Sequence, residues 1–314
     1  MDEAGVDIGH SNVHNTHAMQ TLRSAILLLT TAIIWGVAFV AQSMGMEYVG
    51  PFTFICVRSF LGGLVLIPFV FLYHKGEEPV RASLRQPSLW LGGLACGLVL
   101  CLGCCFQQYA ILFTTVGKAG FIASCSIIIV PLLGLFVGRR CGLNVWMGVA
   151  VAMVGFYFLC INETMYLRLG DSLAFVSTTL FAIHILVIDA AVRRVDNAVL
   201  LSCIMFFVCG VLSSGLMFLC EKPEIAPLLA AWKPVLYAGV LSSGVGFTLQ
   251  MIGQKNIHPS VASLILSLQS VAAMLAGAAL LNQQPTGREV FGCVLVLVAI
   301  VVAQVPLSLF QKFR

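Results

Sequence analysis

The residues of this sequence that could do chemistry are few, and the most prominent ones interrupt long apolar stretches. Arg58 lies within FTFICVRSFLGGLVLIP (residues 52–68), and no Asp or Glu lies deep in any comparable stretch. A charged side chain that is removed from water requires a partner, access to the surface, or a bound ion. Arg58 therefore extends toward the surface, donates to backbone carbonyls, or binds an anionic group of a substrate.

His184 is the one histidine inside an apolar stretch, in LFAIHIL (residues 180–186). Free histidine titrates near pH 6.5, so His184 could take up a proton during a functional cycle. A neutral, hydrogen-bonded imidazole is the alternative.

A third group of candidates consists of amides, hydroxyls and aromatic rings. Trp35, Phe39 and Gln42 fall at i, i+4 and i+7 and therefore share one helix face, which could be a cavity wall or a packing surface. Amides and hydroxyls can orient a small solute by donating and accepting hydrogen bonds, or they can join helices to one another. The further candidates of this kind are Gln107, Gln108, Tyr109, Ser124, Ser126, Gln250 and Gln269.

The elements that carry these residues must be membrane helices. Of the 314 residues, 60% are hydrophobic and 10% are charged, whereas a soluble domain has about 25% charged residues. A bilayer-spanning helix takes about 20 residues, and lipid tolerates no unpaired backbone. We expect ten spans with no strands, at 23–43, 51–73, 88–111, 117–136, 142–161, 169–190, 197–220, 233–254, 259–281 and 287–308.

The charged residues predict the orientation of these spans. With the N-terminus inside, cytoplasmic segments hold eleven of the 17 Lys and Arg residues, and the opposite side holds five. This asymmetry predicts that both termini are cytoplasmic, in a protein of the cell (cytoplasmic or inner) membrane. The net charge of +4 then reflects loop bias and not a nucleic-acid surface. Residues 1–22 are polar and are expected to form a disordered tail.

Metal, cofactor and enzyme chemistry receive little support. The twelve cysteines lie mostly within spans, as in CGLVLCLGCC (residues 96–105), where thiols pack as small apolar groups. His10, His14 and His17 could share a helix face, but a solvated tail explains them without a metal. The phosphate-binding loop GxxxxGK[ST] is absent, and a Ser–His pair is the one enzymatic alternative.

The order of features also repeats between the two halves of the chain. IIWGVAFVAQ aligns with TLFAIHILVI at an offset of 146 residues, Gln108 with Gln250 at 142, and Gly148 with Gly292 at 144. We expect a first repeat at 23–161 and a second at 169–310. Five spans in each would make the repeats inverted, with a site near the midplane where they meet.

The sequence resembles the drug/metabolite transporter superfamily in its EamA-type ten-helix branch. The resemblance rests on IIWGVAFV, PFTFICVRSFLGG, QQYAILFTTVGKAGFIASCSIIIVPLLGLFVGRR, LFAIHIL and ASLILSLQSVAAMLAGAALLNQQPTGREVFGCVLVL. It implies a central cavity lined mainly by the third, fourth, eighth and ninth helices. The family pattern usually places carboxylates in SLEP and LGE segments, where this chain has Gln269, Ser270 and Gln283, so proton coupling there is in doubt.

Together these features predict a secondary transporter that exchanges a small-molecule substrate across a lipid bilayer and requires no cofactor or metal. We expect it to export amino-acid-like metabolites by alternating access, with proton coupling through His184 as an open question. A carrier of lipid-linked or nucleotide-sugar-type molecules is one alternative, and a membrane scaffold without transport is another.

Overall fold

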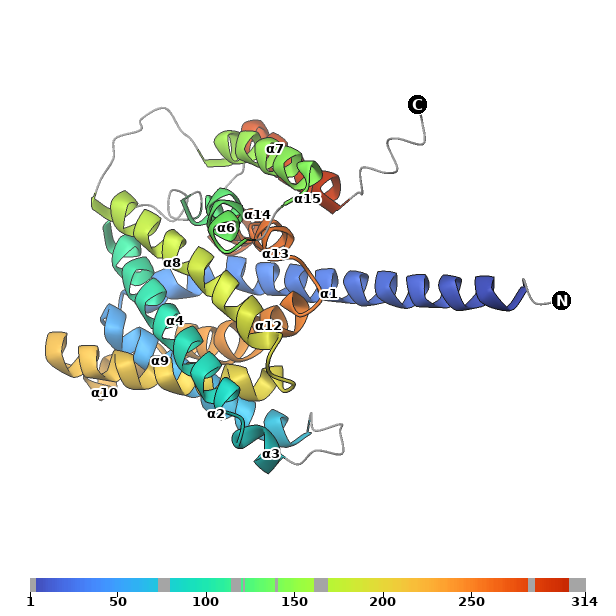
Figure 1. Ribbon diagram of the computed structural model, residues 1–314. Coiled ribbons are helices and arrows are strands. Elements are labelled where there is room, and N and C mark those ends of the chain that lie inside the picture. Colours follow the sequence, from blue (N-terminus) through green and yellow to red (C-terminus); the bar gives the residue numbers. More distant parts are fainter. Residues whose placement is uncertain are drawn as a thin grey trace.

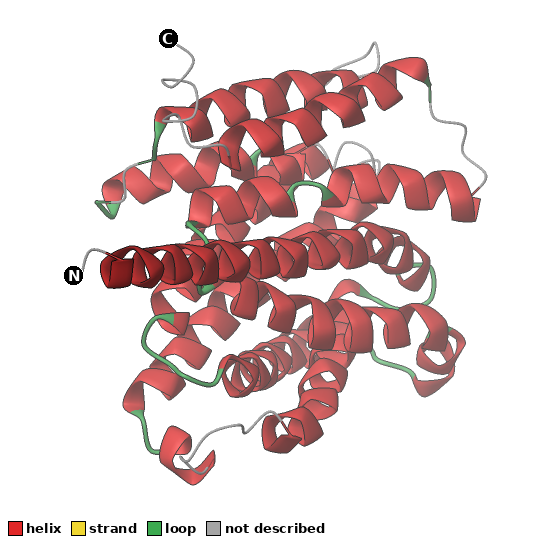
Figure 2. Ribbon diagram, turned by 90° about the vertical axis from the view of Figure 1, so that its right-hand side faces the viewer, coloured by secondary structure: helices red, strands yellow, loops and turns green. Residues whose placement is uncertain are grey.

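The computed structural model is all-helical over the part of the chain that it describes. It describes residues 4–72, 80–113, 120, 122–138, 141–160, 169–281 and 286–304, and none of these forms a strand (Figure 2). Gln283, one of the positions of the family pattern, lies outside these ranges, and so do the side chains of His10, His14 and His17.

Within the described ranges, seven helical stretches are long and apolar enough to cross a bilayer. Five of these are continuous α-helices, and the sixth and seventh each combine successive elements. The continuous helices are α1 (Ala4–Gly45), α2 (Pro51–Leu72), α4 (Pro87–Phe113), α8 (Leu169–Val192) and α9 (Ala198–Cys220). The sixth stretch consists of α11 (Trp232–Leu236), the π-helix η1 (Tyr237–Phe247) and α12 (Thr248–Gln254), and the seventh of α13 (Pro259–Leu266) and α14 (Gln269–Leu281).

Three shorter apolar helices occupy the remaining expected spans. They are α6 (Ser126–Phe136), α7 (Leu143–Cys160) and α15 (Gly287–Gln304), which lie within or across the expected ranges 117–136, 142–161 and 287–308. Two short helices, α3 (Val80–Leu84) and α10 (Ile225–Ala230), connect longer ones.

The N-terminal segment is helical in the structure, where the sequence analysis expected a disordered tail. Helix α1 begins at Ala4, and its N-terminal part projects beyond the bundle in Figure 1. The segment contains no proline, and once a helix exists each added residue gains a backbone hydrogen bond without a new nucleation cost.

The helices pack as pairs whose pattern is the same when the two halves are exchanged. Figure 1 shows α7 beside α15 at one edge of the bundle, and α2 lies against α9. Helix α1 contacts α12 and η1, and in the other half α8 contacts α4 in the same way. Helix α1 also contacts α13 and α14, and the equivalent contact is that of α8 with α6. The contact of α2 with η1 corresponds to that of α9 with α4.

Individual residues at the α2–α9 contact are reciprocal. A Cβ on Gly63 would lie 3.2 Å from the ring of Phe207, and a Cβ on Gly210 would lie 3.1 Å from the ring of Phe60. An offset of 147 residues converts one contact into the other, and Phe60 and Phe207 themselves approach with ring centroids 6.2 Å apart. Reciprocity of this kind is what a two-fold axis between equivalent surfaces produces.

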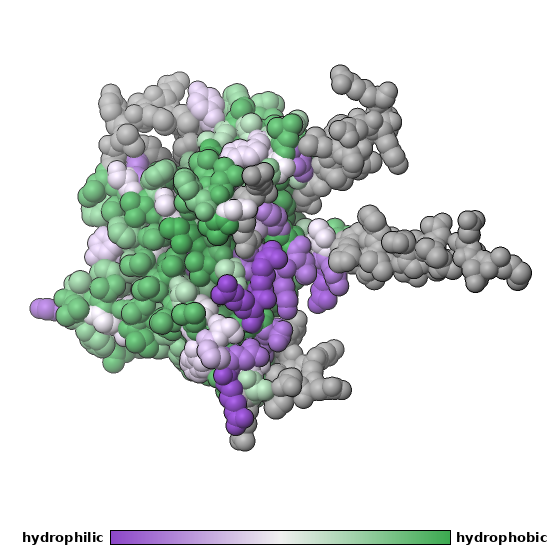
Figure 3. All heavy atoms as spheres, in the orientation of Figure 1, coloured by the Kyte–Doolittle hydropathy of each residue, from purple (hydrophilic) through white to green (hydrophobic). Residues whose placement is uncertain are grey.

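The surface matches a bilayer environment. Large apolar side chains are exposed along the lipid-facing sides of the helices, such as Trp90, Leu91 and Leu94 on α4. Figure 3 shows apolar residues over most of one face and hydrophilic residues gathered on the side from which α1 projects. Exposed basic residues near the helix ends of that side are Arg23, Arg85, Arg193, Arg194 and Lys255.

Candidate functional site

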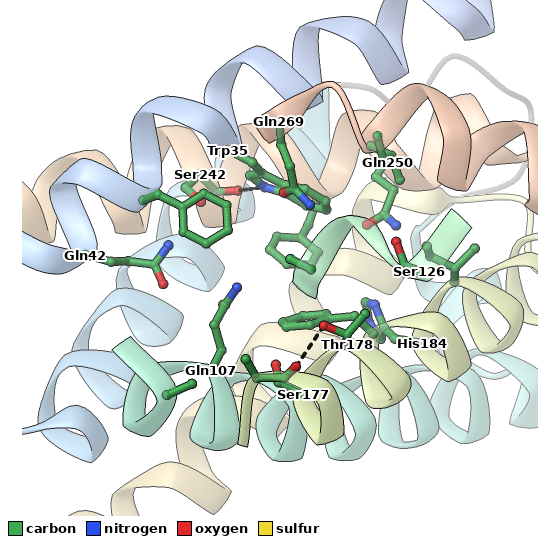
Figure 4. Close-up of a pocket in the computed structure, with 18 of the residues that line it drawn as sticks. Trp35, Gln42, Gln107, Ser126, Ser177, Thr178, His184, Ser242, Gln250 and Gln269 are labelled. Carbon is green, nitrogen blue, oxygen red and sulfur yellow. Dashed lines mark hydrogen bonds between the residues drawn. The ribbon is translucent and has the colours of Figure 1, made fainter. Parts of the chain in front are cut away.

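A cavity lies in the centre of the bundle, between the two halves of the chain. Its empty space, including the open mouth, is about 850 Å³. The cavity wall contains nine of the twelve residues proposed from sequence: Trp35, Phe39, Gln42, Arg58, Gln107, Ser126, His184, Gln250 and Gln269 (Figure 4).

Arg58 is the only permanent charge on the described cavity wall. Its side chain comes from α2 and is 5% exposed, so it does not extend to the surface. Nη2 donates to the thiol sulfur of Cys104 on α4 at 2.8 Å. No carboxylate of the described residues lies within ion-pair distance of it, and no Asp or Glu of these residues lines the cavity. The guanidinium charge is thus buried, and no described residue neutralises it.

His184 lies deeper along the wall, on α8. It is 1% exposed, and its ring packs edge-on against Phe181 and Phe247, with centroids 6.5 and 5.9 Å away. Its Nε2 atom has no hydrogen-bond partner. The imidazole therefore presents an unused polar atom within an aromatic environment.

Two further wall residues present unpaired acceptors. Oε1 of Gln42 and Oε1 of Gln250 are buried and have no partner, and Figure 4 shows both side chains extending into the cavity from opposite ends. Leaving a buried polar atom unsatisfied costs about 1–3 kcal/mol. Three such atoms on one wall, including His184 Nε2, indicate a site whose polar groups are satisfied by what enters it.

Three of the predicted residues do not line the cavity. Gln108 is fully buried and donates from Nε2 to Met46 at 3.3 Å. Tyr109 packs on Phe52 with ring centroids 5.4 Å apart, and Ser124 hydrogen-bonds to Ser270. Successive residues on a helix point about 100° apart, so Gln107, Gln108 and Tyr109 could not all face one cavity.

The structure also shows wall residues that the sequence analysis missed, most of them on α8 and η1. Ser177, Phe181 and His184 fall at i, i+4 and i+7, the same spacing that identified Trp35, Phe39 and Gln42. This spacing in the second half would have predicted Ser177 and Phe181 from the sequence. Ser242 and Phe247 lie on the π-helix, whose altered period leaves no simple spacing to find them. The first and sixth spans thus contribute strongly, beyond the third, fourth, eighth and ninth.

Equivalent hydrogen bonds hold the two sides of the cavity. Thr31 Oγ1 on α1 donates to the carbonyl of Gly246 at 3.1 Å, and Ser177 Oγ on α8 donates to the carbonyl of Gly103 at 2.9 Å. The donors are 146 residues apart and the acceptors 143. An offset of 143 pairs Gln250 with Gln107, not with Gln108 as expected, and it is Gln107 that shares the cavity wall with Gln250.

The chemistry of the wall is that of binding. One cation, one imidazole, several amides and hydroxyls, and the aromatic rings of Trp35, Phe39, Phe181 and Phe247 surround the space. Among the described residues, no group of three His, Cys, Asp or Glu side chains could hold a metal ion. Fold and site together define a multi-pass helical membrane protein with a solute-sized central cavity.

Comparison with known proteins identifies its family. The model of the EamA-like transporter family matches residues 22–161 and again residues 168–304, so the chain belongs to this family. It is 28% identical to an uncharacterized transporter of Archaeoglobus fulgidus over 88% of this chain and 83% of the relative. It is 22% identical to the uncharacterized transporter YoaV of Bacillus subtilis, over 86% and 92%.

A solved crystal structure has the same fold, with a TM-score of 0.74 at 20% sequence identity, over 93% of this chain and 99% of that one. The protein is accordingly a membrane transporter and not an enzyme.

Proposed function

We propose that this protein is a secondary transporter that exports small, amino-acid-like organic metabolites by alternating access through the central cavity. The observation that carries the proposal is the unneutralised Arg58 on the wall of a buried, solute-sized space. A carboxylate is the natural partner of a guanidinium, which it can bind with two parallel hydrogen bonds. A scaffold protein would have no need to keep this charge facing an empty cavity.

Two inverted five-helix repeats, at 23–161 and 169–310, are part of the proposal. The double family match and the reciprocal contacts of α2 with α9 support them. The start of α1 and the end of α15 lie on the same side of the bundle in Figure 1, as ten crossings require. Inverted repeats bind substrate where the halves meet and expose it to each side in turn.

The orientation and the coupling follow from charges. The exposed basic residues Arg23 within α1, Arg193 and Arg194 after α8 and Lys255 after α12 favour this side as the cytoplasmic one, with both termini there and the protein in the inner membrane. Proton coupling, if the cycle uses it, would involve His184, because no carboxylate among the described residues lines the cavity.

The test is transport by the purified chain in proteoliposomes. Vesicles loaded with a panel of amino acids, organic acids, amines and sugars are assayed for uptake of each labelled solute by counterflow. We expect counterflow with carboxylate-bearing solutes and its loss in Arg58→Gln protein of unchanged thermal stability. Absence of flux for the entire panel, with the protein folded and inserted, would reject the transporter of small organic acids in favour of a lipid-linked cargo or a scaffold.

A further inference from the structure

The electric charge of the cavity wall restricts the substrate beyond the class proposed above. Arg58 is the one cation on the described cavity wall, and this part of the wall has no carboxylate to oppose it. A ligand with one negative charge therefore makes the occupied cavity neutral, whereas a zwitterion leaves it with an excess positive charge.

Three described acidic residues of the helical bundle have partners outside the cavity. Glu221 accepts hydrogen bonds from the backbone amides of Phe52 and Thr53, each at 2.8 Å, at the start of α2. Asp189 is fully buried and pairs with Arg193 at 3.1 Å. Asp171, in the first turn of α8, has a partner and does not line the cavity. An ammonium group in the cavity would thus meet Arg58 but no acid.

The unpaired polar atoms match a neutral donor. The amide oxygens of Gln42 and Gln250 can each accept a hydrogen bond from a hydroxyl or an amide N–H, neither of which adds charge. His184 Nε2 is a third unpaired atom on the same wall. A buried like-charge pair is costly at low local dielectric, so a second cation would be disfavoured even with these acceptors present.

The remaining wall is apolar and aromatic. Trp35 packs on Phe247 with ring centroids 4.5 Å apart, and Phe39 and Phe181 lie on the same cavity. Such rings favour a flat apolar body over a polar chain.

We infer that the preferred substrate is a monoanion: a carboxylate with an aromatic or apolar body and a neutral hydrogen-bond donor, such as an N-acylated amino acid or a 2-hydroxy acid. The carboxylate pairs with Arg58, the donor with Gln42 or Gln250, and the body packs on the rings. This inference depends on the proposed transport function and narrows it, because free amino acids and amines become poor substrates.

A ligand series with one constant body tests the charge requirement. N-acetylphenylalanine and 3-phenyllactate carry one negative charge, phenylalanine is a zwitterion, and phenethylamine is a cation. Their affinities for the purified full chain are measured by calorimetry and their fluxes by counterflow. We expect the two anions to bind at least tenfold more tightly than phenylalanine, and phenethylamine to bind weakest.

Two variants connect this order to Arg58. Arg58→Lys keeps the charge and should keep the order of the ligands, while Arg58→Gln should reduce anion binding at least tenfold and abolish the preference over phenylalanine. The comparison within wild type holds even if a variant fails to fold. Gln42→Leu should reduce the advantage of 3-phenyllactate over 3-phenylpropionate, which lacks the hydroxyl.

The outcomes separate the two proposals. If phenylalanine binds and moves as well as the anions, through cation–π contacts of its ammonium group with the rings, the monoanion inference is overturned and the transporter proposal stands. If an unrelated amino acid or amine is the best solute of the wider panel, the monoanion inference is again overturned and the transporter proposal stands. If nothing in either set binds or moves, both fall.

Discussion

Arg58 has five N–H donors, and among the described residues only its Nη2 atom has a protein partner. The thiol that receives this bond comes from a different helix, so it fixes the direction of the guanidinium without neutralising its charge. A carboxylate in place of Cys104 would have formed an internal ion pair and removed the reason for an anion to enter. At the residue scale, the site depends on the N–H donors and the charge of Arg58 that the described residues leave unpaired.

Cys104 should therefore act as a positioning residue. In Cys104→Ala protein we expect the affinity for a carboxylate ligand to fall about three- to tenfold, the equivalent of a weak hydrogen bond of roughly 1 kcal/mol. Thermal stability should change by no more than in the control Cys96→Ala, which removes a buried thiol on the same helix. Unchanged affinity in Cys104→Ala, measured by calorimetry, would remove Cys104 from the site.

Gln107 and Gln108 form a matched pair for separating binding from packing. Gln107 lines the cavity, whereas Gln108 is fully buried against Met46. We expect Gln107→Ala to weaken solute binding several-fold with little loss of stability. Gln108→Ala should leave binding intact and lower the unfolding temperature, because it opens a buried space of about an amide's volume. If instead Gln108→Ala weakened binding and Gln107→Ala lowered the unfolding temperature, α4 would be rotated about its axis relative to the structure.

Sequence spacing predicted many of these residues because polar groups are rare in membrane helices and each is conspicuous. It could not tell Gln107 from Gln108, since that choice depends on how α4 is rotated against its neighbours. Ser177 and Phe181 could have been found by applying the i, i+4, i+7 rule to the second half. The thiol partner of Arg58 could not have been found, because twelve cysteines offer no local signal of which one contacts it.

At the scale of elements, close helix contacts depend on glycine. Where α1 crosses α14, a Cβ on Gly36 would lie 2.4 Å from Cβ of Ala272 and 2.7 Å from the backbone nitrogen of Ala273. The contacting atoms are a Cβ and the backbone, so no flexible side chain can move aside to relieve the contact. The absence of a Cβ thus sets how near these helices approach beside the cavity wall at Trp35.

Gly36→Ala should accordingly destabilise the protein. Overpacking of a fixed contact costs about 1–3 kcal/mol, and we expect the unfolding temperature in detergent to fall by several degrees. Gly215→Ala on α9 is the control, because a Cβ there meets nothing within 4 Å. Equal stability of the two variants would mean that α1 and α14 are farther apart than the structure shows.

The π-helix η1 is the element that sequence did not predict. Its counterpart in the first half, within α4, is a regular α-helix, although both segments accept equivalent hydrogen bonds at Gly103 and Gly246. The glycines and serines of GVLSSG permit either conformation, so propensity does not decide between them. Tertiary contacts decide between the two conformations. One of them is the hydrogen bond that the carbonyl of Ser242 accepts from the indole N–H of Trp35 at 3.3 Å.

For the whole molecule, the sequence predicted an all-helical membrane protein and located its apolar segments well, because length and hydropathy are properties of the chain alone. The pairing of helices is a property of packing, and the sequence analysis did not predict it. Offsets of 146 for Thr31 and Ser177 and of 147 for Phe60 and Phe207 now connect real contacts. The orientation in the membrane remains a prediction from the basic residues.

That orientation can be tested with one natural and one introduced thiol. Cys220 is exposed at the end of α9, on the side opposite to the exposed Lys255 at the end of α12. In intact cells, a membrane-impermeant maleimide should label Cys220 but not a Lys255→Cys, Cys220→Ser variant, which should react only in inverted vesicles. The reason is that positive residues near the spans favour the cytoplasmic side, where Lys255 is accompanied by Arg193 and Arg194. Labelling in the opposite pattern would reverse the topology and with it the direction of the proposed export, while leaving the cavity and its Arg58 unchanged.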